Sequence, residues 1–554
     1  MFLRIIPRSQ LPGTGACIAH RLGLPSQVQQ QLPHVARRRS VAQHRSIVIL
    51  HRPPAAHPPR PWKYRASDRY RYRSCASFVS PSSPSDAMSI TIPPARLLSQ
   101  KSHVVPGQLY VTEYFFRVPL DYSNPSAGEI TLFARSVRKH EPSIIPRSAA
   151  QLEAVPRLPF LAFLEGGPGF GNREPQDHPI TRNILNRGYQ ILFLDYRGVG
   201  LSTPINAQHI LGLGDAQAQA DYLKHFRADN NVRDCEAVRK YITAPLPLEL
   251  RPWSILGQSF GGFVSLTYLS THPEGLNEVF MTGGLAPILR KPEDVYRATF
   301  KKVVERNEAF YRKYPEDVEN VHRILAFLAE AGGVPLPSGG LLTGKRFLSL
   351  GLSFGGHSGI DNVHSLVHRL AADLDQFGFL TRASLSAVEQ SSSLDNNPVY
   401  AILHEAIYCS QPGVASNWAA QRVAAEVDEF AWVRDEASIS RAKPAYFSGE
   451  MIFPFHFETQ PELRELKPAA ELLAGFDGWD KLYDVDRLRG NKVPVFAASY
   501  IEDMYVDFEL ARETASCVAG IKVFETNAMY HNALRSKTEE LLDNLFRLRD
   551  DSID

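Results

Sequence analysis

The sequence contains 554 residues, of which 44% are hydrophobic and 22% charged, and its formal net charge at pH 7 is +2. This composition is typical of a globular protein, and the length allows two or three domains of about 100–200 residues each. The near-zero net charge argues against a polyanionic partner such as nucleic acid, and no apolar run reaches the roughly 18 residues of a membrane-spanning helix.

Residues 1–87 differ from the rest of the chain in charge. They contain 14 Lys and Arg against 2 Asp and Glu, whereas residues 88–554 contain 47 and 57. The segment is rich in Pro and Ser and shows no sustained apolar period. It is therefore predicted to be disordered, because it cannot bury enough surface to offset its ordering entropy. Three explanations stay open: an organelle transit peptide, a weak polyanion-binding segment around residues 37–39, or an extension upstream of a natural start at Met88.

A strand-rich region begins near residue 104. Residues 108–120 and 129–137 alternate apolar and polar side chains, which predicts two antiparallel strands joined by the turn DYSNPSAGE. Four short apolar runs follow, of the kind found in parallel strands buried on both faces. These runs are LPFLAFL, YQILFLD, PWSILGQ and NEVFMT. Helical stretches lie between them, so the pattern predicts a doubly wound, mostly parallel sheet.

Residues 288–485 show no alternation of strands and helices. Amphipathic stretches such as VYRATFKKVVERNEAFYRKYP predict a mostly helical insertion. Strands resume with KVPVFAASY and IKVFETN, and TEELLDNLFRLRD forms a final helix. We therefore predict an α/β core from residues 88–287 and 486–554, with a large helical segment inserted after the sixth strand.

The strongest chemical signal is the hexapeptide GQSFGG, centred on Ser259. It matches the pattern G-x-S-x-G, follows an apolar strand and leads directly into a helix, as a nucleophile elbow requires. Glycines around the serine permit a strained turn that exposes its hydroxyl, and the helix N-terminus stabilises nearby negative charge. The alternative interpretation is a glycine-rich turn with an ordinary serine, and the strand and helix context argues against it.

A serine nucleophile needs a base, and the base needs a carboxylate that orients it. When the serine comes first in the chain, the acid is expected next and the histidine last, each in a loop after a late strand. Asp503 follows the strand VPVFAASY, and His531, the last histidine of the chain, follows IKVFETN. Glu502 and Asp507 are rival acids, and a histidine in an ordinary surface loop is the alternative interpretation of His531.

An oxyanion hole requires backbone N–H groups aimed at the developing charge. The amide of Phe260, directly after the serine, is one expected donor. The second is expected from Gly166 and Gly167, which follow the strand LPFLAFL in the sequence EGGPG. After the next strand, Asp195 and Arg197 in DYRGVGLS are predicted to pair with each other and to brace the loops rather than to act in catalysis.

The five cysteines are scattered and show no CxxC pairing, which excludes a disulfide framework or a zinc site. They are predicted to be small buried thiols in a reducing compartment. We therefore expect a cytoplasmic protein, or an organellar one if residues 1–87 are a genuine transit peptide.

Several segments, in the same order, resemble the prolyl aminopeptidase (proline iminopeptidase) family, serine peptidases of the α/β-hydrolase superfamily. The matching pieces, between about residues 105 and 545, include GGPGFG, LDYRGVGLSTP, GQSFGGFVSLTYLSTHPEGL, LHEAIYC, SGEMIFPF, EDMYVDFELARETA and HNALR. The resemblance implies an α/β-hydrolase fold and release of an N-terminal residue, preferably proline, from peptides with a free N-terminus. It also implies no metal or cofactor, Ser259, Asp503 and His531 as the catalytic triad, and residues 288–485 as a cap over the active site.

The same resemblance implies that carboxylates of the cap hold the substrate's ammonium group. Glu405 in HEAIYC and Glu450 in GEMIFP are the best matches, and the alternative is that both are solvated carboxylates. One position departs from the family: many relatives have His or Gln before GGPG, where this chain has Glu165. An unpaired carboxylate there would oppose the oxyanion, so we expect Glu165 either to pair with an arginine or to face the ammonium group.

Two other functions compete with the exopeptidase. An esterase or amidase for another small acyl substrate is compatible with the same fold, because fold does not determine substrate. A neutral substrate would give buried cap carboxylates no role. A non-catalytic binding protein is disfavoured by the intact Ser, Asp and His, and epoxide hydrolases and dehalogenases need an aspartate at the position of Ser259.

Overall fold

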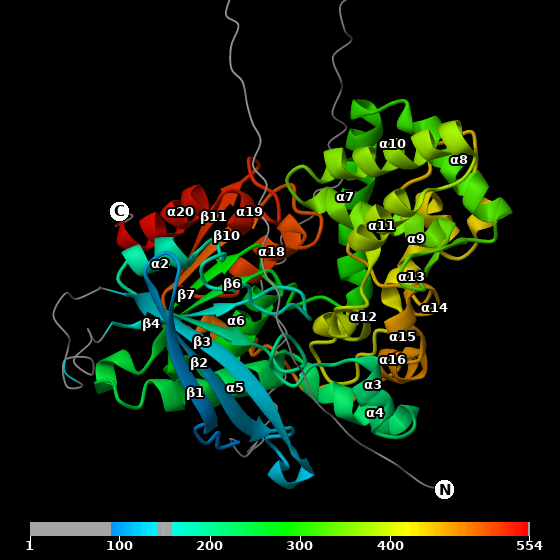
Figure 1. The fold of residues 1–554 in the computed structure, drawn as a ribbon. Helices are drawn as coiled ribbons and strands as arrows, with labels where there is room; N and C mark the ends of the chain where they lie inside the picture. The colour runs from blue at the N-terminus through cyan, green and yellow to red at the C-terminus, as the bar shows by residue number, and fades with distance from the viewer. Residues whose placement is uncertain (1–89, 141–147, 149–157, 552–554) are drawn as a thin grey trace, which may run out of the picture. The chain divides into compact units, whose positions relative to one another are not determined.

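The computed structural model describes residues 90–140, 148 and 158–551. The basic segment 1–87 and its prediction lie outside these residues. The described chain is built around one nine-stranded sheet in the order β1-β2-β3-β5-β4-β6-β7-β10-β11 (Figure 1). Its strands are β1 Arg96–Val105, β2 Leu109–Pro119, β3 Glu129–Lys139, β4 Phe160–Leu164, β5 Gln190–Asp195, β6 Trp253–Gln258, β7 Leu276–Thr282, β10 Val495–Tyr500 and β11 Ile521–Thr526.

The sheet changes direction between its two halves. Strands β1, β2, β3 and β5 pair antiparallel in that order. From β5 onward each neighbour pairs parallel, through β4, β6, β7 and β10 to β11. The mostly parallel α/β sheet predicted from the apolar runs is therefore confirmed, as is the antiparallel pair around the turn at residues 120–128.

Strand β1 was not predicted. Seven of its ten residues are exposed and three are partly buried, and its sequence RLLSQKSHVV carries no two-residue apolar alternation. An edge strand that buries little surface leaves a weak pattern. Because β1 precedes the predicted strands, the helical insertion follows the seventh strand of the sheet rather than the sixth.

Helices cover both faces of the sheet. One buried cluster joins α5 and α6 to strand residues such as Ala162 and Ile255. A second joins α2 and α20 to Phe163, Phe280 and Phe496 on the opposite face. The α-helices of this part are α2 Thr181–Asn186, α3 Ala207–Leu211, α4 Ala216–Leu223, α5 Ala228–Ile242, α6 Phe260–Thr271, α18 Phe508–Ala515, α19 Ala533–Ser536 and α20 Thr538–Asp550.

The segment between β7 and β10 is mostly helical. Within it, only β8 Val334–Pro335 and β9 Leu341–Leu342 form a short hairpin. Its α-helices are α7 Pro292–Lys313, α8 Asp317–Glu330, α9 Gly344–Leu348, α10 Gly359–Phe377, α11 Arg382–Ser392, α12 Pro398–Leu403, α13 Ala419–Ala424, α14 His456–Thr459, α15 Pro461–Arg464, α16 Lys467–Ala474 and α17 Val485–Arg489. Figure 1 shows most of them gathered beside the sheet rather than on its faces.

The sequence explains the limits of α7, the longest of these helices. Proline occupies its first turn, where the missing N–H costs nothing. Glu293 and Asp294 lie near its N-terminus and Arg312 and Lys313 near its C-terminus, which complements the helix dipole at both ends.

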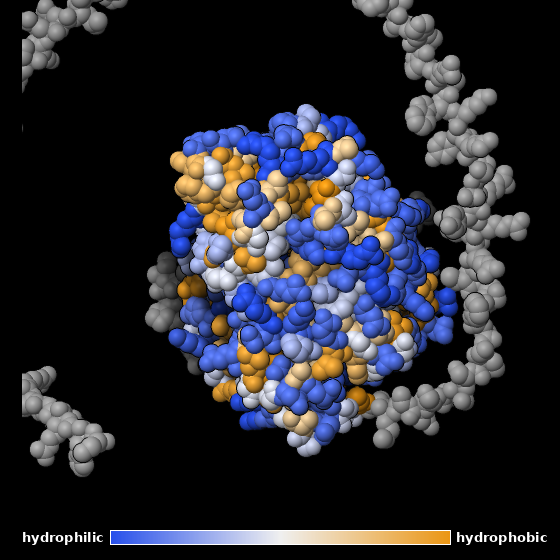
Figure 2. All heavy atoms as spheres, turned by 90° about the vertical axis from the view of Figure 1, so that its right-hand side faces the viewer, coloured by the Kyte–Doolittle hydropathy of each residue, from blue (hydrophilic) through white to orange (hydrophobic). Residues whose placement is uncertain are grey.

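The surface is mainly hydrophilic on the side that these helices present, with apolar areas between the polar ones (Figure 2). Among the described residues, no helix combines the length and the apolar character needed to cross a bilayer.

Candidate active site

Ser259 lies at the turn between β6 and α6 with φ 54° and ψ −120°. A positive φ is rare for a residue with a side chain, so the surrounding chain must hold the turn in place. A Cβ on Gly261 would stand 2.0 Å from the Leu164 carbonyl oxygen, and one on Gly262 would stand 2.3 Å from that of Gly284. Glycine is needed at both positions because the backbone of the neighbouring strand ends passes too close for any side chain.

Ser259, His531 and Asp503 form one hydrogen-bonded chain. The distance from Ser259 Oγ to His531 Nε2 is 2.8 Å, and that from His531 Nδ1 to Asp503 Oδ2 is also 2.8 Å. All three residues are buried. The structure thus brings together three residues that are up to 272 positions apart in the sequence, in the arrangement that activates a serine.

Asp503 is held in place by the backbone that follows it. Its Oδ1 accepts the N–H groups of Tyr505 at 2.9 Å and Val506 at 3.0 Å. The two rival acids have other partners: Glu502 pairs with Lys302 at 3.4 Å, and Asp507 caps the N-terminus of α18. Asp503 is therefore the carboxylate that orients His531.

The pKa of His531 is raised above its ordinary value. Burial alone would lower this pKa, because it disfavours the imidazolium. The carboxylates of Asp503 and Glu450 outweigh burial and raise the pKa, and Arg535 opposes them. The site therefore stabilises the protonated form of His531.

The loop after β4 runs along the serine. A Cβ on Gly166 would lie 3.1 Å from Ser259 Cβ, which places the loop against the elbow. The Gly166 amide was expected to be an oxyanion donor, but its N–H donates to Glu165 Oε1 at 2.8 Å instead. The amides of Gly167 and Phe260, the other two expected donors, have no hydrogen-bond acceptor among the described residues.

Glu165 is paired with an arginine, one of the two arrangements expected for it. Its side chain is buried, and Oε1 also accepts a hydrogen bond from Arg535 Nη2 at 3.0 Å. Arg535 lies on α19, four residues after His531. The ion pair therefore joins the loop after β4 to the segment that carries the histidine.

Asp195 and Arg197 do not pair with each other, so that prediction is wrong. The Arg197 guanidinium binds both carboxylate oxygens of Asp234 at 2.7 Å. Asp195 instead accepts the N–H groups of Asn172 and Leu201. Both side chains brace the fold, as expected, but Arg197 does so through Asp234, 37 residues away, and Asp195 through Leu201, six residues away, and Asn172, 23 residues away.

Glu450 belongs to the helical insertion and contacts two other residues of it. Its Oε1 accepts the Tyr400 hydroxyl at 3.0 Å and is 3.8 Å from His404 Nε2. Its charge contributes to the raised pKa of His531. A cavity of about 50 Å³, lined by Tyr400, Glu450 and Met451 among others, adjoins it.

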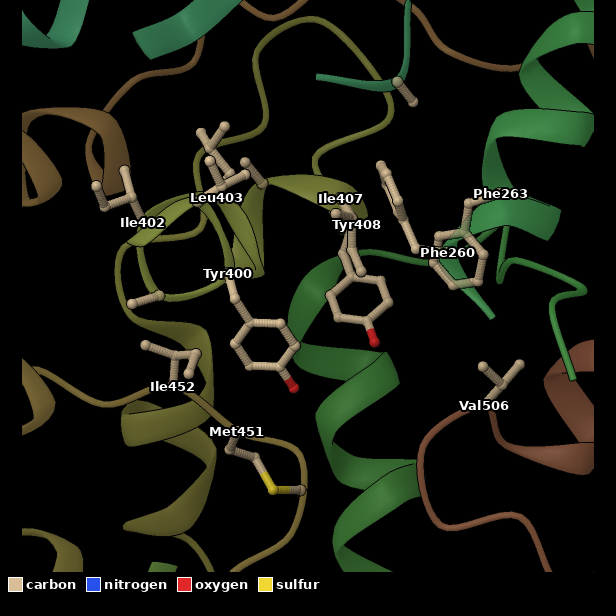
Figure 3. Close-up of a cluster of buried hydrophobic side chains, with 14 of the residues drawn as sticks. Phe260, Phe263, Tyr400, Ile402, Leu403, Ile407, Tyr408, Met451, Ile452 and Val506 are labelled. Atoms are coloured by element: carbon tan, nitrogen blue, oxygen red, sulfur yellow. The ribbon is translucent and has the colours of Figure 1, made fainter. Parts of the chain in front are cut away.

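Aromatic and aliphatic side chains surround this region. Figure 3 shows Tyr400 and Tyr408 with their hydroxyls pointing the same way, between residues of the insertion and Phe260, Phe263 and Val506 of the core. The rings of Phe263 and Tyr408 are 6.1 Å apart. The insertion and the elbow thus contribute to one apolar cluster at the site.

Glu405 is buried, but its carboxylate is engaged by the insertion itself. Oε1 accepts the N–H of Ala420 at 2.9 Å, and Oε2 accepts that of Ala419 at 3.2 Å, at the start of α13. Burial raises the pKa of Glu405, and these amides oppose the increase. Of the two predicted cap carboxylates, Glu450 has the freer carboxylate and a direct electrostatic effect on His531.

Comparison with known proteins places the chain in a family. The model of the α/β hydrolase fold matches residues 159–351. The chain is 41% identical over 468 residues to the proline iminopeptidase aneH of Aspergillus aculeatus, covering 84% of this chain and 100% of the relative. It is also 41% identical over 457 residues to a proline iminopeptidase of Aeromonas sobria, covering 82% of this chain and all of the relative. The chain belongs to the proline iminopeptidase family.

Among solved structures, a proline iminopeptidase of Mycobacterium smegmatis aligns with 76% of this chain and 94% of its own, at 13% identity and a TM-score of 0.35. The full-length matches to curated relatives decide the family, and they confirm the resemblance drawn from the segments GGPGFG to HNALR. The match to the model of the α/β hydrolase fold confirms the predicted fold.

Two residues of this proline iminopeptidase site had not been singled out from the sequence. Arg535 lies in the matching segment HNALR, and only its contact with Glu165 identifies it. Tyr400 lies five residues before Glu405, but its hydroxyl contacts Glu450, 50 positions away. Proximity to a motif could have suggested either residue, but the partners of Arg535 and Tyr400 cannot be identified without the fold.

Proposed function

We propose that the protein is a serine exopeptidase that releases an N-terminal residue, preferably proline, from peptides through an acyl-enzyme. One observation carries this proposal: the buried chain from Ser259 through His531 to Asp503 lies within the electrostatic reach of Glu450, an acid of the insertion. A carboxylate so placed suits a substrate whose free ammonium group lies next to the bond that is cleaved.

The reaction begins when Ser259 Oγ attacks the carbonyl carbon of the first residue. His531 Nε2 takes the hydroxyl proton, and Asp503 stabilises the resulting imidazolium. The amides of Gly167 and Phe260 hold the oxyanion. The C–N bond then breaks as His531 returns the proton to the leaving amine, and a water molecule repeats the cycle to release the free amino acid.

Glu450 is proposed to bind the substrate's ammonium group, and the apolar cluster around Tyr400 and Tyr408 to accept the pyrrolidine ring. Residues 288–485 would then act as the cap that closes the pocket beyond the first residue, with residues 88–287 and 486–554 as the catalytic core. Glu405 supports this pocket by holding the start of α13, and any contact of its own with the ammonium group is secondary. A peptide with a free N-terminus is the only partner that this arrangement requires.

We further propose a cytoplasmic location. Cys235 and Cys409 are buried thiols, which is consistent with a reducing compartment.

The test is hydrolysis of a fluorogenic proline amide by the purified protein, compared with acetyl-proline amide, alanine amide and a simple acetate ester. We expect turnover of the free-amine proline amide, slower turnover of alanine amide and none of the acetylated form. Ser259→Ala is the background control. Cleavage of the ester alone would replace the exopeptidase with an esterase of the same fold, and failure of fluorophosphonate to label Ser259 would contradict a serine hydrolase altogether.

A further inference from the structure

Glu165 occupies an unusual place for an acid. It follows β4 directly, its side chain is 3% exposed, and its carboxylate accepts the Gly166 N–H beside the expected oxyanion donor Gly167. A carboxylate so close to a developing oxyanion would oppose the reaction if its charge were unbalanced. The position therefore needs a physical reason.

The carboxylate oxygen Oε1 performs two tasks. It accepts the Gly166 N–H at 2.8 Å, which fixes the orientation of the peptide unit between Glu165 and Gly166, directly before Gly167. It also accepts the hydrogen bond from Arg535 Nη2 at 3.0 Å. Because the Gly166 N–H is already engaged, the next amide along the loop, that of Gly167, is left to act together with the Phe260 amide as the second oxyanion donor.

The backbone at Gly167 is in the left-handed region, with φ 119°. This conformation turns the loop sharply beside Ser259, and the hydrogen bond from Gly166 lies immediately before the turn. Fixed orientation is what gives oxyanion donors their effect, because no reorganisation is needed as charge develops.

Arg535 supplies the opposing charge. It is the cation that contacts Glu165 among the described residues, and its side chain is 44% exposed, so it approaches the buried acid from the surface. Its charge also lowers the pKa of His531, opposing Asp503 and Glu450, which raise it. It lowers the pKa of His178 as well. The ion pair therefore links the oxyanion loop, the catalytic histidine and the surface.

We propose that Glu165 is a positioning residue that sets the oxyanion loop through the Gly166 amide, and that Arg535 is the counter-charge that makes an acid tolerable there. This inference rests on the proposed function. It predicts that the two residues depend on each other. A carboxylate at position 165 without Arg535 should slow the reaction, whereas a neutral hydrogen-bond acceptor at position 165 should not need the arginine.

The experiment compares Arg535→Met, Glu165→Gln, Glu165→Leu and the double variant Glu165→Gln/Arg535→Met in the full-length protein. Glutamine keeps an acceptor for the Gly166 amide without the charge, so kcat for proline amide should stay within about threefold of the parent. Arg535→Met and Glu165→Leu should each lower kcat by about tenfold or more, with KM changed much less. The double variant should recover to the level of Glu165→Gln.

Lys537→Met is the matched control, because it removes a nearby cation that pairs with Glu540 instead. The rate of fluorophosphonate labelling of Ser259 is measured on every variant, since it reports the oxyanion hole without requiring a peptide substrate. If the parent is labelled but does not cleave proline amide, the proposed function fails while labelling rates still test the positioning role.

A pH profile separates positioning from simple loss of structure. Because Arg535 lowers the pKa of His531, Arg535→Met should also move the acidic limb of the labelling rate to higher pH. The proposal is overturned if Arg535→Met keeps kcat and labelling rate within twofold of the parent, or if the double variant is as slow as Arg535→Met.

Discussion

At the scale of single residues, the charges around His531 are the feature that most directly controls reactivity. Asp503 contacts the imidazole, whereas Glu450 acts on it from the insertion, and together they overcome the effect of burial. Only the neutral imidazole can take the serine proton. Activity should therefore be lost as pH falls through the raised pKa, so that the acidic limb lies at higher pH than the ordinary pKa of histidine would give.

Replacing Glu450 by glutamine should separate its two effects. The loss of its charge removes one of the influences that raise the pKa of His531, so the acidic limb of Ser259 labelling should move to lower pH. The kcat/KM for proline amide should fall by about tenfold or more, because the ammonium group loses its partner. Glu426→Gln, which removes an exposed acid paired with Arg297 on the same insertion, is the control. A labelling profile that does not move, with unchanged kcat/KM, would contradict both roles.

At the scale of elements, the turn from β6 to α6 could be predicted from the sequence because its signal is local. An apolar run, three glycines and a helical stretch follow one another without a gap, and late strands place Asp503 and His531 in the order that such a turn requires. Contacts between distant segments left no such signal. Nothing near Arg197 indicates that Asp234, 37 residues on, is its partner.

Two further elements show the same limit. Strand β1 pairs along one edge and none of its residues is buried, so no apolar alternation marks it. Glu405 was predicted from its motif, but the amides at the start of α13, which occupy its carboxylate, lie 14 and 15 residues later. Motifs and buried strands could thus be predicted, whereas the acceptors and donors that each polar group uses could not.

The elbow itself should tolerate no added atom at Gly262. In Gly262→Ala the new Cβ would meet backbone atoms of Gly284, the nearest at 2.3 Å, which cannot move aside as a flexible side chain does. We expect at least about a hundredfold slower labelling of Ser259 and a free energy of unfolding lower by about 1–3 kcal/mol. Gly490→Ala is the control, because its nearest contacts are at 3.6 Å and its φ is −94°. Normal labelling in Gly262→Ala would show that the turn is less constrained than its contacts indicate.

At the scale of the whole molecule, the insertion and the sheet share a hydrophobic interior. One buried cluster includes Val264 and Ile255 of the core together with Val321, Val367 and Phe447 of the insertion. The segment that carries His531 also bonds to the insertion, since the His531 N–H donates to the Gly355 carbonyl at 3.3 Å. A shared interior of this kind couples the stability of the two parts.

The insertion and the sheet should therefore unfold together. In urea, hydrogen exchange at α10 and at β6 should report the same midpoint, and far-UV circular dichroism should show one transition at that midpoint. Binding of fluorophosphonate to Ser259 should shift both regions equally. Two separate midpoints, with α10 exchanging first, would show that the insertion is stabilised independently of the sheet.

The chain leaves the sheet at the end of β7 and returns in β10, and these two strands are hydrogen-bonded neighbours, with Val279 opposite Val495. The whole helical segment is therefore a single connection between two neighbouring parallel strands, leaving at the C-terminal end of one and returning at the N-terminal end of the other. A connection of this kind can change in length without changing the register of the strands that precede Ser259, Asp503 and His531. Insertions and deletions within it are therefore expected to leave the strand pairing intact, even though its buried side chains share a cluster with the sheet.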